Sequence, residues 1–409
     1  MQLSVTARDR DNNAQLTVTP SSMNLAPGQT ASVTVRLAGS RPPAGNYEGV
    51  IAIRAGSTNL RVPYLYLVGD GVVANVFPLR GSGFKGAVND KDWLMAFKAV
   101  DRFGVPVANA PVRFRVGRGG GSISSADATT DVLGIAAANV NLGPQLGEQL
   151  FTAEIGNQVL EFNGTARLQP VIATDGAVSA ASFQVGPGLA PGSTIAIRGA
   201  ALSNSTRTAT SASLPLILGG ASVSFDNTAE KISVPGRIQS VSEGQVVVQI
   251  PWELLGLNSV QMKVTAGDIS SAVYTVPLAD YAPGVFEAED SSGRRFANAL
   301  DEAGGAVGSA NPARRGRTVA FFAAGLGPVS EQPASGEPGP VEPLARTRVQ
   351  PVVTIGGKRA EVIYSGLAPG RVGVYQINVI VPPDSAAGVQ AVAVSANGIE
   401  APNVTIPVE

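Results

Sequence analysis

The 409-residue sequence contains no cysteine and no histidine. Without cysteine the chain can form no disulfide, offers no thiolate to a metal and has no cysteine nucleophile. Without histidine it lacks the commonest general base, and a Ser-His-Asp triad cannot form within it. Carboxylate pairs and Ser-Lys dyads stay open as catalytic arrangements. We nevertheless predict no enzyme activity, no catalytic residue, no cofactor and no metal site in this chain.

Strong charge and long apolar runs are also missing. The 30 basic and 31 acidic residues are spread along the chain and leave a net charge of −1. No block is basic enough to follow a phosphate backbone, so nucleic acid is not expected as a partner. No run of 18 apolar residues exists, so we expect no membrane span. The first residues lack the features of a signal peptide, and we expect Met1 to lie inside a longer polypeptide.

What the sequence does contain is glycine, proline and alternating strands. There are 48 glycines and 29 prolines, and they mark many turns. In residues 375–381 (YQINVIV) the odd positions are apolar and the even ones mostly polar, which predicts a strand with one buried face. Similar alternation occurs in residues 32–37, 112–116 and 194–198. Short strands between Gly/Pro turns predict β-sandwiches of about 100 residues each.

A repeat with a period near 130 residues covers the C-terminal half. Gln249-Ile250-Pro251 corresponds to Ile380-Val381-Pro382, and the Gly219-Gly220 turn is matched with Gly356-Gly357. We therefore predict two copies of one sandwich, which meet at Ala282-Pro283-Gly284.

These residues resemble a known family. Residues 177–409 are similar to the Solibacter-type uncharacterised C-terminal domain, which occurs at the ends of large secreted proteins. Among the matching motifs are Ala180-Ala181-Ser182-Phe183, Val248-Gln249-Ile250-Pro251-Trp252, Asn311-Pro312-Ala313 and Gly325-Leu326-Gly327-Pro328. The resemblance implies paired immunoglobulin-like units with no assigned activity.

Two further resemblances precede this one. Residues 99–107 (AVDRFGVPV), 110–116 and 130–136 resemble the bacterial immunoglobulin-like domain of invasin and intimin, a spacer that holds an adhesive tip away from the membrane. Asp101 and Asp131 stand beside glycine turns, where an Asp side chain can bond nearby backbone amides. Residues 1–72, with Gly45-Asn46-Tyr47-Glu48-Gly49 and Leu60-Arg61-Val62-Pro63-Tyr64, resemble the fibronectin-III-like domain that follows the catalytic domain of secreted subtilisin-like peptidases.

Six short motifs have both a chemical and a structural interpretation, and in each the structural one is favoured. The acidic stretches 9–13 and 89–92 resemble calcium loops but lack the required spacing, which favours solvated turns. The glycine-rich stretch 117–122 lacks the features of a phosphate loop and predicts a hairpin turn. The basic residues 313–317 are interpreted as a charged edge rather than a site for an acidic polymer. Trp93 and Trp252 are assigned to a core or a domain joint rather than to sugar stacking. Pro333–Pro343 is expected to be a stiff exposed loop rather than a polyproline ligand.

The sequence thus predicts an all-β chain of four tandem immunoglobulin-like or fibronectin-III-like sandwiches in an elongated arrangement. The expected boundaries are 1–72, 73–170, 171–281 and 282–409. The favoured function is an extracellular or cell-surface spacer, adhesion or interaction module, expected to be monomeric, with an unknown protein or polysaccharide ligand. One alternative is the accessory region of a secreted subtilisin-like peptidase whose catalytic domain lies upstream. A second alternative is a carbohydrate-binding protein, with Trp252 in the site.

Overall fold

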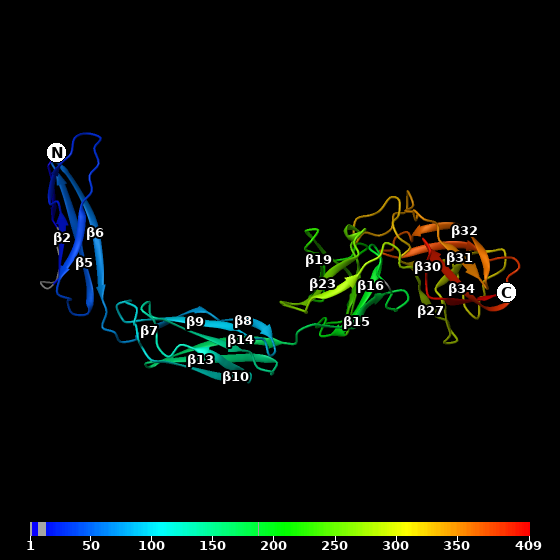
Figure 1. The fold of residues 1–409 in the computed structure, drawn as a ribbon, viewed down its shortest axis with the longest axis horizontal. Coiled ribbons are helices and arrows are strands. Elements are labelled where there is room, and N and C mark those ends of the chain that lie inside the picture. The colour runs from blue at the N-terminus through cyan, green and yellow to red at the C-terminus, as the bar shows by residue number, and fades with distance from the viewer. Residues whose placement is uncertain (1, 7–13, 187) are drawn as a thin grey trace. The chain divides into compact units, whose positions relative to one another are not determined.

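The computed structural model describes residues 2–6, 14–186 and 188–409 (Figure 1). The chain divides into two compact units, residues 1–168 and residues 169–409. Strands make up both units, and the one helical element among the described residues is the 3-10 turn η1 (Trp252–Leu254). The predicted all-β class is therefore confirmed. The elongated arrangement and the four domain boundaries stay predictions.

The first unit begins with two facing sheets between residues 2 and 68. One sheet has the order β3-β1-β5-β6, and the other pairs β2 with β4. The strands are β1 (Gln2–Thr6), β2 (Ala14–Thr19), β3 (Ser22–Asn24), β4 (Thr34–Gly39), β5 (Gly45–Ala55) and β6 (Thr58–Val68).

Few aliphatic side chains of residues 14–68 are fully covered. Those that are buried are Ala14, Ile51, Ala55 and Val68. More are exposed, namely Val35, Leu37, Leu60, Val62, Leu65 and Leu67. Apolar burial is the main stabilising term in folding. Among the described side chains, this sandwich therefore has the smallest hydrophobic contribution to stability.

The second sandwich of the first unit has a well-packed core. Its sheets have the orders β10-β13-β14-β8 and β11-β12-β9-β7. Met95, Phe97, Phe151 and Phe162 are fully buried between them. The strands are β7 (Asn75–Arg80), β8 (Phe84–Ala87), β9 (Trp93–Val100), β10 (Val112–Arg118), β11 (Ser122–Ala126), β12 (Ile135–Asn141), β13 (Gly147–Ile155) and β14 (Gln158–Arg167).

The glycine-rich stretch 117–122 is not the hairpin turn that we predicted. It carries the chain from β10 in one sheet to β11 in the other. The crossing is tight: a Cβ on Gly119 would lie 2.3 Å from the side chain of Gln149, and one on Gly121 would lie 2.5 Å from the Asn141 carbonyl oxygen. Glycine is required here because two backbones and a buried amide approach closely.

The second unit opens with a sandwich of residues 171–277. Its sheets have the orders β15-β16-β22-β21-β17 and β18-β19-β23-β24, with β20 and β25 added at β19 and β23. Ile195, Val248, Phe225 and Met262 fill the space between them. The strands are β15 (Val171–Ser179), β16 (Thr194–Ala200), β17 (Arg207–Thr208), β18 (Ile217–Leu218), β19 (Ala221–Asn227), β20 (Ile232–Pro235), β21 (Arg237–Val241), β22 (Gln245–Gln249), β23 (Ser259–Ala266), β24 (Ile269–Ser270) and β25 (Tyr274–Pro277).

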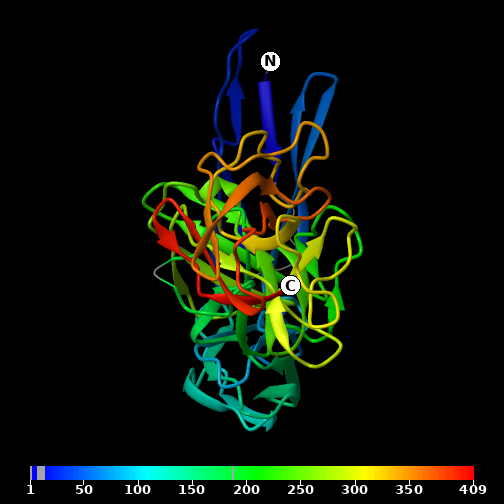
Figure 2. The ribbon, with the colours of Figure 1, turned by 90° about the vertical axis from the view of Figure 1, so that its right-hand side faces the viewer.

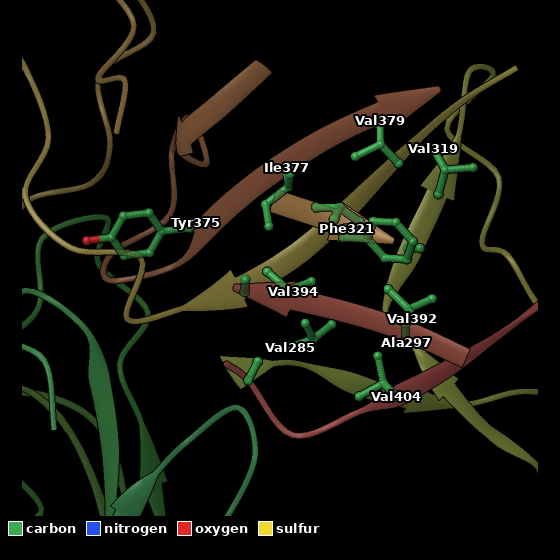
Figure 3. Close-up of a cluster of buried hydrophobic side chains, with 14 of the residues drawn as sticks. Val285, Ala297, Val319, Phe321, Tyr375, Ile377, Val379, Val392, Val394 and Val404 are labelled. Carbon is green, nitrogen blue, oxygen red and sulfur yellow. The ribbon is translucent and has the colours of Figure 1, made fainter. Parts of the chain in front are cut away.

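The last sandwich covers residues 284–408 and closes over the largest core. Its main sheet has the order β26-β30-β33-β32-β31-β34-β35. Figure 3 shows Ile377 and Val379 of β33 across from Val392 and Val394 of β34, with Phe321 between the layers. The strands are β26 (Gly284–Val285), β27 (Glu287–Glu289), β28 (Arg295–Ala297), β29 (Ala299–Asp301), β30 (Thr318–Ala324), β31 (Val352–Ile355), β32 (Lys358–Leu367), β33 (Tyr375–Ile380), β34 (Gly388–Ala396), β35 (Ile399–Glu400) and β36 (Val404–Val408).

Strand pairing supports the predicted repeat. The ladder of β16 with β22 corresponds to that of β30 with β33, and the Val223–Val264 pair of β19 and β23 corresponds to the Val353–Val394 pair of β31 and β34. Parallel bridges between Leu189 and Leu278 and between Ala313 and Val408 add a further equivalence. Both halves therefore use the same order of strands.

One predicted correspondence within the repeat is wrong. Gly219-Gly220 joins β18 to β19 and so precedes the strand that pairs with β23. Gly356-Gly357 follows β31, the equivalent strand, and leads into β32. Both pairs have positive φ angles, from 57° to 79°. They mark the same kind of tight hairpin at opposite ends of equivalent strands, so the shared dipeptide reflects turn geometry and not position.

Candidate functional site

The two sandwiches of the C-terminal unit are joined through a buried tryptophan. Trp252 follows β22 of the 171–277 sandwich, but its side chain is 4% exposed and belongs to the core cluster of the 284–408 sandwich. Its backbone N–H donates to Ser335 Oγ at 2.8 Å, and Ser335 in turn donates to the Glu253 carboxylate at 2.6 Å. The predicted role of Trp252 at a domain joint is confirmed, and burial leaves its ring unable to stack on a sugar.

The loop that contains Ser335 was predicted to be exposed, and this is wrong at its centre. It belongs to the connection from residue 325 to 351, drawn in gold to orange in Figures 1 and 2. Ser335 and Gly336 are buried against the preceding sandwich. Gly336 N donates to Gln249 Oε1 at 2.6 Å, and Leu214 N donates to the Gly336 carbonyl at 2.9 Å. The prolines of this loop predict an exposed segment, but hydrogen bonds to the preceding sandwich bury its centre.

A cavity of about 280 Å³ opens beside this junction. The 171–277 sandwich supplies Phe183, Gln239 and Gln245, and the 284–408 sandwich supplies Phe286, Asn298 and Arg371. Phe286 and Asn298 are held by a backbone ladder, since Asn298 N donates to the Phe286 carbonyl and Phe322 N donates to the Asn298 carbonyl. The cavity therefore combines two aromatic rings, three amides and one guanidinium, with Gln239 on β21, Gln245 on β22 and the other four residues in connecting segments.

Two arginines at or beside this cavity contact aromatic rings: Arg371 lines it, and Arg198 does not line it but contacts the lining residue Phe183. The Arg371 guanidinium lies 4.7 Å from the centre of the Phe322 ring, and that of Arg198 lies 5.3 Å from the centre of the Phe183 ring. Neither arginine has an ion-pair partner among the described residues. A cation placed on a ring face keeps its N–H donors free for a further acceptor.

The backbone at two cavity positions departs from regular strand geometry. Phe183 has a φ of 54°, in the left-handed region that bulky residues rarely adopt, and the residue is 43% exposed. Gln239 sits at a β-bulge, where the register of β21 with β22 shifts between Ile238 and Ser240. Bulges turn a side chain out of the regular alternation and are common beside binding sites.

The remaining sequence candidates do not assemble into a site. Residues 9–13 lie outside the described residues. In the 89–92 turn, Asp90 accepts from Trp93 Nε1 at 3.0 Å. Neither this turn nor any other part of the described chain brings together three or more potential metal ligands. The half-buried Trp93 packs on Phe84 with ring centres 5.5 Å apart.

The basic cluster 313–317 is engaged within its own sandwich. Arg314 pairs with Glu409 at 2.8 Å, Arg315 donates to the Glu409 carbonyl at 3.0 Å, and Arg317 lies 3.6 Å from Glu302. The cluster precedes β30, and Ala313 forms a parallel bridge with Val408 of β36. The charged-edge interpretation stays a prediction. Arg314 and Arg315 hold Glu409 against the sandwich.

Asp-x-x-Gly turns recur four times, at Asp101, Asp131, Asp290 and Asp301. In each, one carboxylate oxygen accepts the backbone N–H groups two and four residues further on. The glycine three residues on has a φ between 73° and 81°. The predicted bonding of Asp101 and Asp131 is confirmed, and the sequence pattern D-x-x-G identifies the other two turns.

The hydrogen bonds of two of these turns lower carboxyl pKa values. Those from Ser292 and then Ser309 hold the pKa of Asp290 well below its usual range. The side-chain hydrogen bond from Asn311, followed by the backbone N–H of Gly305, lowers the pKa of Asp301. Hydrogen bonds to the charged form stabilise it. Both carboxylates therefore serve as structural acceptors and not as proton donors.

The fold resembles solved structures of tandem immunoglobulin-like domains at low identity. A 282-residue C-terminal fragment of intimin, in complex with the intimin-binding domain of its translocated receptor, is 14% identical, with a TM-score of 0.31; the match covers 53% of this chain and 66% of that one. Invasin, a bacterial integrin-binding protein, is 12% identical over 100% of this chain and 71% of that one, with a TM-score of 0.25. The Escherichia coli adhesin FdeC is 14% identical over 83% and 99%, with a TM-score of 0.20.

These likenesses are too distant to assign a family. The chain spans about two thirds of the length of the intimin fragment, and domains 4 and 5 of the S-layer protein SbsC are matched over 65% of their length. No family model and no curated protein matches the sequence. The Solibacter-type and peptidase-associated resemblances therefore stay predictions. No helix in the described part of the chain is long and apolar enough to cross a membrane.

Sequence reasoning missed the cavity. Its lining residues come from six segments, around residues 180–183, 194, 239–247, 286, 298 and 371–374. Phe183 belongs to the Ala180-Ala181-Ser182-Phe183 motif, but no motif joins the six segments into one set. One signal was present. Phe183 follows the turn at residues 180–182, Phe286 follows the Ala282-Pro283-Gly284 joint, and neither aromatic residue lies in a strand.

Proposed function

We propose that this chain is a non-catalytic extracellular interaction module in which the two joined sandwiches of the C-terminal unit hold a binding surface at a fixed spacing. The observation that carries this proposal is the locked joint of the C-terminal unit. There Trp252 of one sandwich completes the core of the next. A spacer has to transmit position from one domain to its neighbour, and a buried joint does so better than a flexible linker.

Three hydrogen bonds across the joint support a rigid connection. Gln249, Trp252 and Leu214 each bond to the 335–336 segment of the following sandwich. A fourth bond links Ser213 Oγ to the Glu337 carboxylate at 2.7 Å. Buried hydrogen bonds between fixed backbones tolerate little rotation, because any movement leaves polar groups unpaired.

The absence of cysteine gives a direct test of this rigidity. Spin labels attached to Glu230→Cys and Glu361→Cys, both at exposed positions on different sandwiches, report one distance by double electron–electron resonance. We expect a single narrow distribution, broadened by Trp252→Ala. A broad distribution in the otherwise unchanged chain would refute the spacer proposal. Trp93→Ala in the first unit is the control, since it removes the other tryptophan far from the joint along the chain.

The accessory region of a secreted subtilisin-like peptidase is the second candidate. It rests on the resemblance of residues 1–72 alone. Detection of the native polypeptide with an antibody against residues 285–409 tests it. A species much larger than 41.6 kDa with serine peptidase activity would support it, and a band at this mass would refute it.

A further inference from the structure

We propose that the cavity beside the joint of the C-terminal unit binds an acidic saccharide through a hexuronate unit. This inference rests on the proposed interaction function and names the class of ligand. The volume of about 280 Å³ lies near the lower end of the range for small-molecule sites, about 300–1,000 Å³. One pyranose ring with its carboxylate is a ligand of suitable size.

The charge of the cavity selects an anion. Arg371 lines it, Arg198 lies directly opposite the lining residue Gln245 in the β16–β22 ladder, and none of the lining residues is acidic. Both guanidinium groups lack a carboxylate partner in the described part of the chain. Guanidinium groups bind carboxylates in a planar two-point geometry. A carboxylate on the ligand would supply the missing partner.

The neutral groups of the cavity select a sugar. Gln239, Gln245 and Asn298 make no side-chain hydrogen bond within the described residues. Each amide offers both donors and an acceptor, which matches hydroxyl groups that also donate and accept. Phe183 and Phe286 add apolar surface for the C–H face of a pyranose ring. The cavity therefore has partners for the carboxylate, the hydroxyls and the ring of a hexuronate.

An extended acidic peptide fits the cavity less well. Peptides that bind to sheet proteins commonly add a strand at an open edge. The sheet residues of this cavity lie on β16, β21 and β22, each of which is paired on both sides. Only side chains on a sheet face are offered, so no row of backbone groups is free to pair with a peptide.

Calorimetric titration of the full chain tests the inference. The probes are oligosaccharides of galacturonate, of alginate and of hyaluronate, with a dextran oligosaccharide as the neutral control and oligoglutamate as the acidic peptide. We expect at least one hexuronate to bind and dextran to fail. Arg371→Gln should weaken binding about tenfold or more, since charged hydrogen bonds contribute that much. Phe286→Ala should also weaken it.

A matched variant controls for total charge. Arg348→Gln removes one exposed arginine of the same sandwich that does not line the cavity, and binding should be unchanged. The inference is refuted if no hexuronate binds, if Arg371→Gln and Arg348→Gln weaken binding equally, or if oligoglutamate binds as tightly as the best saccharide. The spin-label distance across the joint is measured separately, so a rigid joint without saccharide binding would refute this inference and leave the spacer proposal standing.

Discussion

Gly192 lies directly against the indole ring of Trp252: a Cβ on Gly192 would stand 2.2 Å from the ring atom Cη2. Gly192 also has a φ of 82° and donates its N–H to the Ile250 carbonyl at 2.8 Å. The turn that begins β16 therefore forms one wall of the tryptophan's site. Any side chain at position 192 would therefore clash with the indole ring of Trp252, which lies in the core of the neighbouring sandwich.

Gly192→Ala is expected to displace Trp252 and to loosen the joint. The new methyl group adds overpacking of about 1–3 kcal/mol to the cost of the positive φ angle, about 1 kcal/mol. Gly256→Ala is the matched control, because Gly256 has the same φ of 82° with nothing within 4 Å of a Cβ. Tryptophan fluorescence and denaturant unfolding measure both variants. Equal losses of stability in the two would contradict the packing argument.

The buried amide of Gln249 should be essential for the joint. It is 1% exposed, donates to the Gly192 carbonyl at 2.9 Å and accepts from Gly336 N. Gln249→Leu leaves both backbone groups buried without partners, which costs about 1–3 kcal/mol for each group. We expect a lower free energy of unfolding in urea, together with a broader spin-label distance distribution. Gln261→Leu, at an exposed position of β23, should change neither measurement.

The four Asp-x-x-Gly turns differ in burial, so their aspartates should differ in importance. Asp101 is 1% exposed and accepts three backbone N–H groups, from Phe103, Val105 and Asp70. Asp131 is exposed and accepts two. Asp101→Ala should therefore destabilise the chain by about 2–4 kcal/mol, and Asp131→Ala by clearly less. Thermal unfolding of both variants measures the two losses of stability. A larger loss for Asp131→Ala than for Asp101→Ala would contradict the prediction.

Acid should remove the stabilisation that Asp290 provides. Its pKa is lower in the folded chain than its ordinary value of about 3.9. A depressed folded pKa gives a contribution that is complete above the ordinary pKa and is lost as the pH falls towards the folded value. Asp290→Asn should lower the melting temperature at neutral pH, and the difference from the unchanged chain should shrink towards about pH 2. A difference independent of pH would show that the charge is unimportant.

Hydrogen exchange should distinguish the sandwiches by their cores. The amides of β5 lie over the few buried aliphatic groups of residues 14–68, whereas β33 crosses the largest core cluster. Protection tracks the local free energy of opening, which rises with buried apolar contacts. We expect β5 to exchange faster than β33 under the same conditions. Equal protection of the two strands would contradict this ranking.

The sequence by itself determined the class of fold and the local turns. Period-two alternation ended by proline predicts strands such as β33, because a strand's two faces and proline's missing N–H are local properties. The same holds for the turns at Asp101 and Asp131, because the backbone N–H groups that each turn supplies to its aspartate lie two and four residues further on. The third donor to Asp101, the Asp70 N–H, is distant in sequence. The repeat could be predicted because its strands and turns are also local patterns. The two Gly-Gly turns are the exception, since the same hairpin geometry occurs at opposite ends of equivalent strands.

Only the tertiary structure decided which residues form the contacts between the two sandwiches of the C-terminal unit. Ser335 and Gly336 have the composition of an exposed loop, yet they are buried by partners more than 80 residues away. The Trp252 side chain packs in the core of the following sandwich and not in the core of the sandwich that precedes it in the chain. The cavity gathers Phe183, Gln239, Gln245, Phe286, Asn298 and Arg371 from segments that share no motif. Packing across a joint depends on shape and on partners distant in sequence, so no local pattern of residues encodes it.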